Sequence, residues 1–134
     1  HQPRRQRQMC IRDRLYCDAG KVIAVVQPHR YSRVKDLFSD FCACFNNADV
    51  TIVADIYAAG EPPIPGFEKE DLVRGLHEFG NRNAITLKSK DQLAKLIKAS
   101  AEPGDLVIFL GAGTITSWAS ELPEQLASIY TQEL

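Results

Sequence analysis

The chain has 134 residues, 45% of them hydrophobic and 25% charged, which is the composition of an ordinary globular protein. This length suits one domain and not two, and a formal net charge of −1 gives no global signal for binding nucleic acid or an anionic membrane. No apolar run approaches the ~18 residues of a transmembrane helix, so neither nucleic acid nor a membrane is expected as a partner.

The first twenty residues differ in charge from the rest. They hold five arginines against two aspartates, a net +3, which leaves −4 for residues 21–134. They show neither helical nor strand periodicity. A basic arm for nucleic acid is one interpretation. We prefer the other, that residues 1–20 are non-native or disordered, because QRQMCIRDR also resembles translated adapter sequence. The fold is therefore expected within residues 21–134.

Apolar runs then alternate with amphipathic stretches. VIAVV (22–26) predicts a strand buried on both faces, and VTIVADIY (50–57) predicts a second strand. Between them, apolar residues at three- and four-residue spacing predict a helix ending near Asn46. The proline-rich AAGEPPIPG (58–66) must be a loop. The helix would bury Val34, Leu37, Phe38, Phe41 and Phe45.

The second half repeats this pattern. A helix over 68–79 is expected, stopped by Gly80, and AITL (84–87) predicts a third strand. Ser89 would cap the next helix in a capping box with Gln92. The inward faces of these two helices would be formed by Leu72, Leu76 and Phe79, and by Leu93, Leu96 and Ile97.

DLVIFL (105–110) predicts the fourth strand, with Asp105 closing the turn at Pro103 and Gly104. A last helix follows, and Pro123 is expected to kink it or to start a new one. Its apolar residues are Ile115, Trp118, Leu122 and Leu126.

The order of these elements indicates an α/β fold, a Rossmann-like, mainly parallel sheet of about four strands flanked by helices. Ligands of such sheets bind beyond the carboxyl ends of the strands. Three polar or glycine-rich segments fall there: QPHRYSR (27–33), DIYAAGE (55–61) and GAGT (111–114).

QPHRYSR is the most informative segment. Arg30 and Arg33 lie three apart at the start of a predicted helix, so they could share one face. Two guanidinium groups there suit a carboxylate or phosphate, with the helix dipole and free N–H groups adding attraction. His29 could add a hydrogen bond. The alternative is that these side chains are solvated, or pair with Asp36, Asp40 or Glu61.

The other segments give weaker signals. Asp55 and Glu61 could bind magnesium or act as acid and base, but carboxylates more often face solvent or pair with arginines. Tyr57 could stack on a base or cover the core. GAGT lacks the third glycine of a dinucleotide fingerprint. Cys42 and Cys44 point apart on a helix, so they cannot hold one metal together. We expect both to be buried and reduced.

Three strings together, VVQPHRYSRVKDLFSDF, DVTIVADIYAAGEPPIPG and GDLVIFLGAG, resemble the C-terminal domain of the Mur ligase family, in particular its members that join L-alanine to UDP-N-acetylmuramate in peptidoglycan synthesis. The resemblance covers residues 21 to about 127. It implies a cytoplasmic bacterial ligase that depends on ATP and magnesium. ATP would convert the lactyl carboxylate to an acyl phosphate, which the amine of alanine attacks. The C-terminal domain would close as a lid.

The resemblance also implies roles for residues. His29, Arg30 and Arg33 would bind the carboxylate of L-alanine, and Asp55, Tyr57 and Glu61 would shape the domain interface or site wall. The ATP and UDP-sugar sites belong to earlier domains, so no catalytic residue, cofactor or metal is expected on this chain alone.

One departure from the family pattern concerns the start of the domain. The family's DYGHHPTE-like motif, with its first strand and helix, does not precede Lys21. We therefore expect residues 21–134 to be a domain truncated at its N-terminal end, inactive alone, with an exposed sheet edge. A stand-alone α/β module that binds a small anion remains the alternative.

Overall fold

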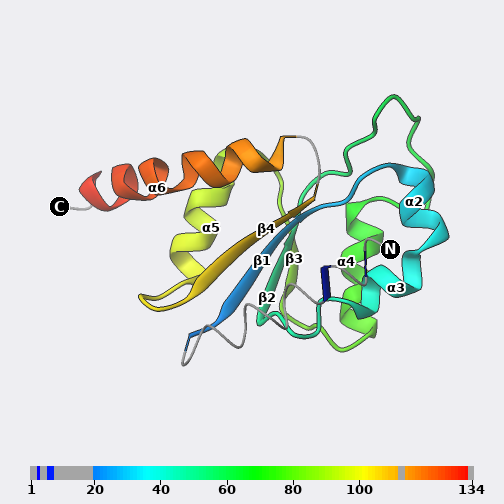
Figure 1. Cartoon of the computed structure of the whole chain (residues 1–134), viewed down its shortest axis with the longest axis horizontal. Coiled ribbons are helices and arrows are strands. Elements are labelled where there is room, and N and C mark those ends of the chain that lie inside the picture. Colours follow the sequence, from blue (N-terminus) through cyan, green and yellow to red (C-terminus); the bar gives the residue numbers. More distant parts are fainter. Residues whose placement is uncertain (1–2, 4–5, 8–19, 112–113, 133–134) are drawn as a thin grey trace.

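A four-stranded parallel sheet forms the centre of the computed structural model, which describes residues 3, 6–7, 20–111 and 114–132 (Figure 1). The strands are β1 (Val22–Gln27), β2 (Val50–Val53), β3 (Ala84–Thr86) and β4 (Leu106–Gly111), in the order β3-β2-β1-β4. Residue Val25 of β1 lies opposite Ile52 of β2 and Phe109 of β4. The predicted fold class is confirmed.

Helices cover both faces of this sheet (Figure 1). Side chains alternate along β1, so Ala24 packs on the face covered by α3 (Phe38–Ala43) and α4 (Lys69–Glu78). Val25 packs on the opposite face with α5 (Leu93–Ser100) and α6 (Ile115–Gln132). All six residues of β1 are buried, as expected for a central strand between two helical layers.

The predicted first helix is in fact two six-residue helices. These are α2 (Tyr31–Asp36) and α3, separated at Leu37, whose φ of −117° and ψ of 22° leave the helical region. Val34, Phe41 and Phe45 are buried as predicted, whereas Leu37 and Phe38 are only partly buried. The strand predicted over 50–57 is also too long, because β2 ends at Val53.

Helix α4 begins with a capping box that the sequence analysis did not identify. Glu68 is the N-cap, and its backbone N–H donates to Asp71 Oδ2 at 3.1 Å. Leu72 and Leu76 are fully buried as predicted. The inward prediction for Phe79 is wrong: it is the C-cap residue, past the regular helix, and 44% exposed.

The expected capping box at Ser89 is wrong as well. Ser89 precedes a short 3₁₀ turn, η1 (Lys90–Gln92), and makes no side-chain cap hydrogen bond. Its backbone carbonyl accepts the Gln92 N–H at 3.1 Å instead. Pro123 lies inside α6, so it does not start a new helix. None of the helices in the described ranges is long and apolar enough to cross a membrane.

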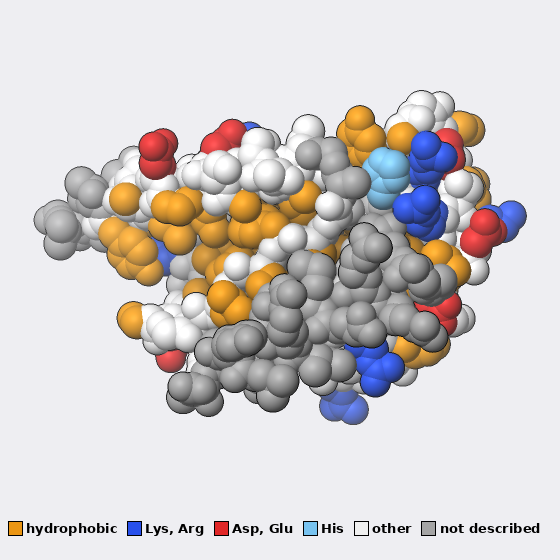
Figure 2. Space-filling view, in the orientation of Figure 1, with side chains coloured by type: hydrophobic (Ala, Val, Ile, Leu, Met, Phe, Trp, Pro, Cys, Tyr) orange, Lys and Arg blue, Asp and Glu red, His pale blue; other side chains and the backbone are white. Residues whose placement is uncertain are grey.

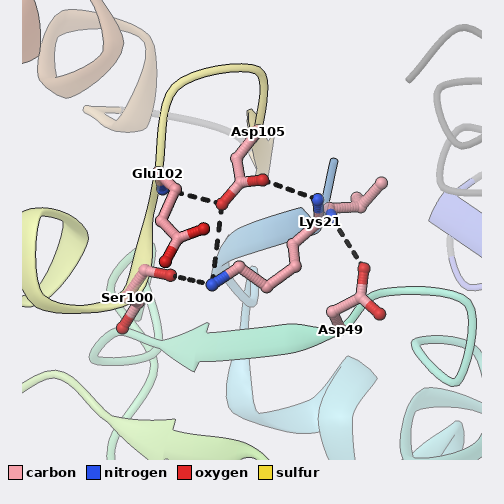
Figure 3. A network of polar contacts seen from close by, with 6 residues as sticks. Lys21, Asp49, Ser100, Glu102 and Asp105 are labelled. Carbon is pink, nitrogen blue, oxygen red and sulfur yellow. Dashed lines mark hydrogen bonds and ion pairs between the residues drawn. The ribbon is translucent and has the colours of Figure 1, made fainter. Parts of the chain in front are cut away.

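A polar network closes the amino end of the sheet (Figure 3). The Lys21 backbone N–H donates to Asp105 Oδ1 at 2.7 Å, and the Val22 N–H donates to Asp49 Oδ2 at 2.8 Å. The Glu102 N–H donates to Asp105 Oδ2 at 2.8 Å, which confirms that Asp105 closes its turn. Hydrogen bonds from Lys21 and then Glu102 lower the pKa of Asp105. The network ties β1 to the turn before β4.

The cysteines and the first nineteen residues are described only in part. Cys42 and Cys44 are buried and unbridged, as expected. Of the first nineteen residues, Pro3, Gln6 and Arg7 are described; all three are helical, and Pro3 and Gln6 are buried. The other residues of that segment, including Cys10 and Cys17, lie outside the described ranges, as do Ala112 and Gly113 of the GAGT segment.

Candidate functional site

Two of the three candidate segments meet at the carboxyl edge of the sheet. His29 and Tyr57 form an isolated parallel bridge beyond the ends of β1 and β2. The Tyr57 N–H donates to the Pro28 carbonyl at 2.8 Å, and the Arg30 N–H donates to the Tyr57 carbonyl at 2.7 Å. The β1–β2 pairing thus continues briefly past the strands, and it fixes the loop after β1 against the loop after β2.

The side chains of this bridge pack on one another. The rings of His29 and Tyr57 are stacked, with centroids 5.3 Å apart and planes 11° from parallel. Tyr57 is 39% exposed and His29 is half-buried. The Tyr57 ring thus packs on the His29 imidazole and does not cover the core; its stacking on a base stays a prediction.

Arg30 has an unusual backbone. It is a non-glycine residue with φ of 68° and ψ of 132°, a conformation that costs about 1–3 kcal/mol and that clusters at functional sites. Arg33 lies one turn further along α2, and both residues are exposed. In Figure 2 a histidine lies beside two basic side chains at the α2 end of the molecule. The geometry therefore presents cationic side chains to solvent at the edge where ligands of parallel sheets bind.

Glu61 approaches the same turn from the other loop. Its Oε1 accepts the Ser32 N–H at 3.0 Å, and its Oε2 accepts the Ser32 hydroxyl at 2.8 Å. These two bonds, then the charges of Arg30 and His29, lower the pKa of Glu61. An arginine was one expected partner of Glu61, but the hydrogen bonds of its carboxylate go to Ser32.

The backbone N–H groups at the start of α2 differ from the expectation. Free N–H groups at the start of a helix were expected to attract an anion. The Ser32 N–H is occupied by Glu61 and the Arg30 N–H by Tyr57, and α2 is only six residues long. Two backbone donors of this turn are therefore already occupied.

Asp55 has a separate partner. Its Oδ1 lies 2.8 Å from Lys69 Nζ, which also donates to the Leu87 carbonyl at 2.8 Å. This ion pair ties the end of β2 to the start of α4 and to the segment after β3. The Asp55 carboxylate is 78% exposed. Nowhere in the described ranges do three or more His, Cys, Asp or Glu side chains come together as a metal site.

Sequence reasoning missed two residues of this edge. Ser32 was part of the QPHRYSR string, but a small hydroxyl residue carries no signal for its partner in a loop 29 positions away. Lys69 was included only as part of a helix. Its ion pair with Asp55 could not be predicted from the sequence, because the contact depends on how α4 packs.

The third candidate segment begins at Gly111. This residue has φ of +150°, and a Cβ there would lie 2.5 Å from the Gln27 carbonyl oxygen. Glycine thus allows the ends of β1 and β4 to approach closely. The Gln27 side chain beside it is buried, and its Oε1 has no hydrogen-bond partner among the residues that the structure describes.

A parallel sheet in the order β3-β2-β1-β4 with helices on both faces defines a Rossmann-like domain. The family model described as "Mur ligase, glutamate ligase domain" matches residues 7–113. The chain therefore belongs to the Mur ligase family, which confirms the resemblance.

Comparison with curated proteins identifies similar sequences within this family. The chain is 61% identical over 110 residues to UDP-N-acetylmuramate–L-alanine ligase of Phenylobacterium zucineum (strain HLK1), and 58% identical over 110 residues to the ligase of the same name from Paramagnetospirillum magneticum (strain ATCC 700264 / AMB-1). Each alignment covers 82% of this chain and 23% of the relative. The chain thus spans about a quarter of the length of these relatives.

A solved structure shares the fold. It is a domain whose crystal structure is described as that of a UDP-N-acetylmuramate:L-alanyl-gamma-D-glutamyl-medo-diaminopimelate ligase from Haemophilus ducreyi 35000HP. The TM-score is 0.66 at 16% sequence identity, over 94% of this chain and 85% of that one. At this identity the likeness concerns the fold alone.

Proposed function

We propose that residues 21–134 are the amino-acid-binding, C-terminal domain of an ATP-dependent ligase that joins L-alanine to UDP-N-acetylmuramate. Membership of the Mur ligase family and the names of relatives 61% and 58% identical support this proposal. The proposed domain acts with the other domains of the ligase, and by itself it is expected to be inactive.

The observation that carries the proposal is the set of cationic side chains at the carboxyl edge of the sheet. Arg30 and Arg33 offer only N–H donors, arranged in forks that match a carboxylate. His29, held by its stack on Tyr57, stands next to Arg30. Such a site would bind the acid end of alanine and leave its amine free to attack.

The proposed contribution of this domain is positioning. The alanine nitrogen attacks the acyl carbon of the activated UDP-N-acetylmuramate; a C–N bond forms, the C–O bond to phosphate breaks, and the amine loses a proton. Holding the carboxylate turns the nitrogen toward the acyl carbon and makes the step effectively unimolecular. ATP supplies the activating phosphoryl group in the other domains, and no step is assigned to magnesium on the described residues.

Asp55, Tyr57 and Glu61 are proposed to shape the wall of the site or its interface with the other domains. Asp55 and Tyr57 suit contact with another domain because their side chains are exposed while other interactions hold them. Glu61 faces the arginine-bearing turn.

The test uses the complete ligase with Arg30→Ala and Arg33→Ala. Losing one charge-assisted hydrogen bond costs about 1.5–3 kcal/mol, so the KM for alanine should rise about 10- to 150-fold, measured as alanine-dependent ADP release. The KM for ATP should hardly change. Lys35→Ala, an exposed basic residue of the same helix, is the matched control. An unchanged KM for alanine in both arginine variants would refute the proposal.

A further inference from the structure

Glu61 forms hydrogen bonds to the short segment, residues 30–33, that carries both arginines. Its two carboxylate oxygens accept the N–H and the hydroxyl of Ser32, at 3.0 and 2.8 Å, and Ser32 lies between Arg30 and Arg33. We propose that Glu61 is a positioning residue, which sets the spacing of the two guanidinium groups and so the affinity for the carboxylate of the amino acid. This inference rests on the proposed function.

The loop after β2 holds both flanks of the strained residue. On one side the Arg30 N–H donates to the Tyr57 carbonyl at 2.7 Å. On the other side Ser32 is bound by Glu61, four residues further along the same loop. A non-glycine residue keeps a φ of 68° only when its surroundings over-determine it, and these two anchors supply that constraint.

Glu61 lies in a loop with restricted backbone conformations. Its N–H donates to the Ala58 carbonyl at 3.0 Å, across a turn in which Ala59 and Gly60 have φ of +51° and +88°. Pro62, Pro63 and Pro65 follow, and each fixes its own φ. Little conformational entropy is therefore lost when the carboxylate binds Ser32.

The electrostatics support the same role. The charges of Arg30 and His29 add to the Ser32 hydrogen bonds in stabilising the ionised carboxylate of Glu61, so at neutral pH the anchor carries its full negative charge. The Glu61 carboxylate thus interacts electrostatically with Arg30 and His29 as well as binding Ser32.

The anchor lies at the surface, which separates its role from global folding. Both hydrogen bonds to Ser32 are exposed, and exposed contacts of this kind contribute little to the free energy of unfolding. Glu61 variants should therefore fold normally and change the site alone.

The experiment measures steady-state kinetics of the complete ligase carrying Glu61→Ala, Glu61→Gln or Ser32→Ala. Because a displaced pair of guanidinium groups binds the carboxylate less well, Glu61→Ala should raise the KM for alanine about tenfold. The kcat, the KM for ATP and the melting temperature should stay near wild type. Glu61→Gln should recover much of the loss, since its amide oxygen can still accept the Ser32 N–H. Glu78→Ala is the control for removing an acidic side chain, because Glu78 is an exposed residue at the C-terminal end of α4.

Two results would overturn the positioning role: an unchanged KM for alanine in Glu61→Ala, or a Glu61→Gln variant as impaired as Glu61→Ala. Arg30→Ala, measured alongside, separates the two proposals. If Arg30→Ala raises the KM and Glu61→Ala does not, only the positioning role fails. If neither Arg30→Ala nor Arg33→Ala changes the KM, the proposed carboxylate site itself fails.

Discussion

Replacing Arg30 by glycine and by alanine should invert the usual order of stability. Within regular structure glycine is less stable than alanine by about 0.5–1 kcal/mol. At Arg30, with φ of 68° and ψ of 132°, a residue with a Cβ carries a strain of about 1–3 kcal/mol that glycine avoids. The difference, about 0–2.5 kcal/mol with a midpoint of about 1 kcal/mol, leaves Arg30→Gly the more stable variant.

Urea denaturation measures this difference directly. Trp118, the only tryptophan of the chain, packs against the core on the α5–α6 face and reports unfolding by fluorescence. With a slope typical of a small domain, the Arg30→Gly midpoint should lie about 0.5–1 M above that of Arg30→Ala.

A matched pair in the same helix supplies the control. Lys35 is an exposed residue of α2, and there alanine should be more stable than glycine by about 1 kcal/mol. If Arg30→Ala proves at least as stable as Arg30→Gly while Lys35 behaves normally, the backbone of Arg30 is not strained, and the argument that strain marks the site is refuted.

Two further predictions concern the fold, and the same denaturation assay checks both. Gly75→Ala should destabilise the chain by about 1–3 kcal/mol, because the new methyl group would overlap Cys42 Sγ in the α3–α4 interface; adding Cys42→Ala should restore most of this, and a coupling energy near zero would contradict the overlap. Asp105 has a lowered pKa in the folded chain, so its stabilisation is present above the pKa of the unfolded state and is lost as pH falls through the folded value. Asp105→Asn should therefore be less stable at neutral pH and lose less stability on acidification than wild type; equal losses would argue against this linkage.

The sheet could be predicted from the sequence because its buried strands appear as runs of apolar residues. VIAVV is continuous in apolar residues and entirely buried between two helical layers, which is the pattern of a central parallel strand. The length of the second strand was overestimated because Ala54 and Ile56 are also buried although the ladder ends at Val53. Apolar residues therefore continued past the point where strand pairing stopped.

Helix boundaries were less predictable. The break at Leu37 coincides with no glycine or proline, and the apolar spacing runs through it. Ser89 has the residue type of a cap, but a 3₁₀ turn satisfies its carbonyl and leaves its side chain unused. Glu68 is an uncommon N-cap residue, so the capping box that does form was not recognised.

The sequence placed the two loops of the candidate site at one edge of the sheet, since parallel strands end on the same side. It could not show that Arg30 adopts a conformation normally reserved for glycine. Nor could it pair Glu61 with Ser32, because that contact depends on the path of a loop and not on any periodic pattern. The roles of His29, Arg30 and Arg33 toward alanine remain predictions.

The most direct measurement is a crystal structure of the complete ligase with its alanine-bearing product bound. We predict that oxygens of the alanyl carboxylate lie within about 3.2 Å of guanidinium nitrogens of Arg30 and Arg33, with Glu61 still bound to Ser32. Guanidinium groups that face bulk solvent, far from that carboxylate, would contradict it.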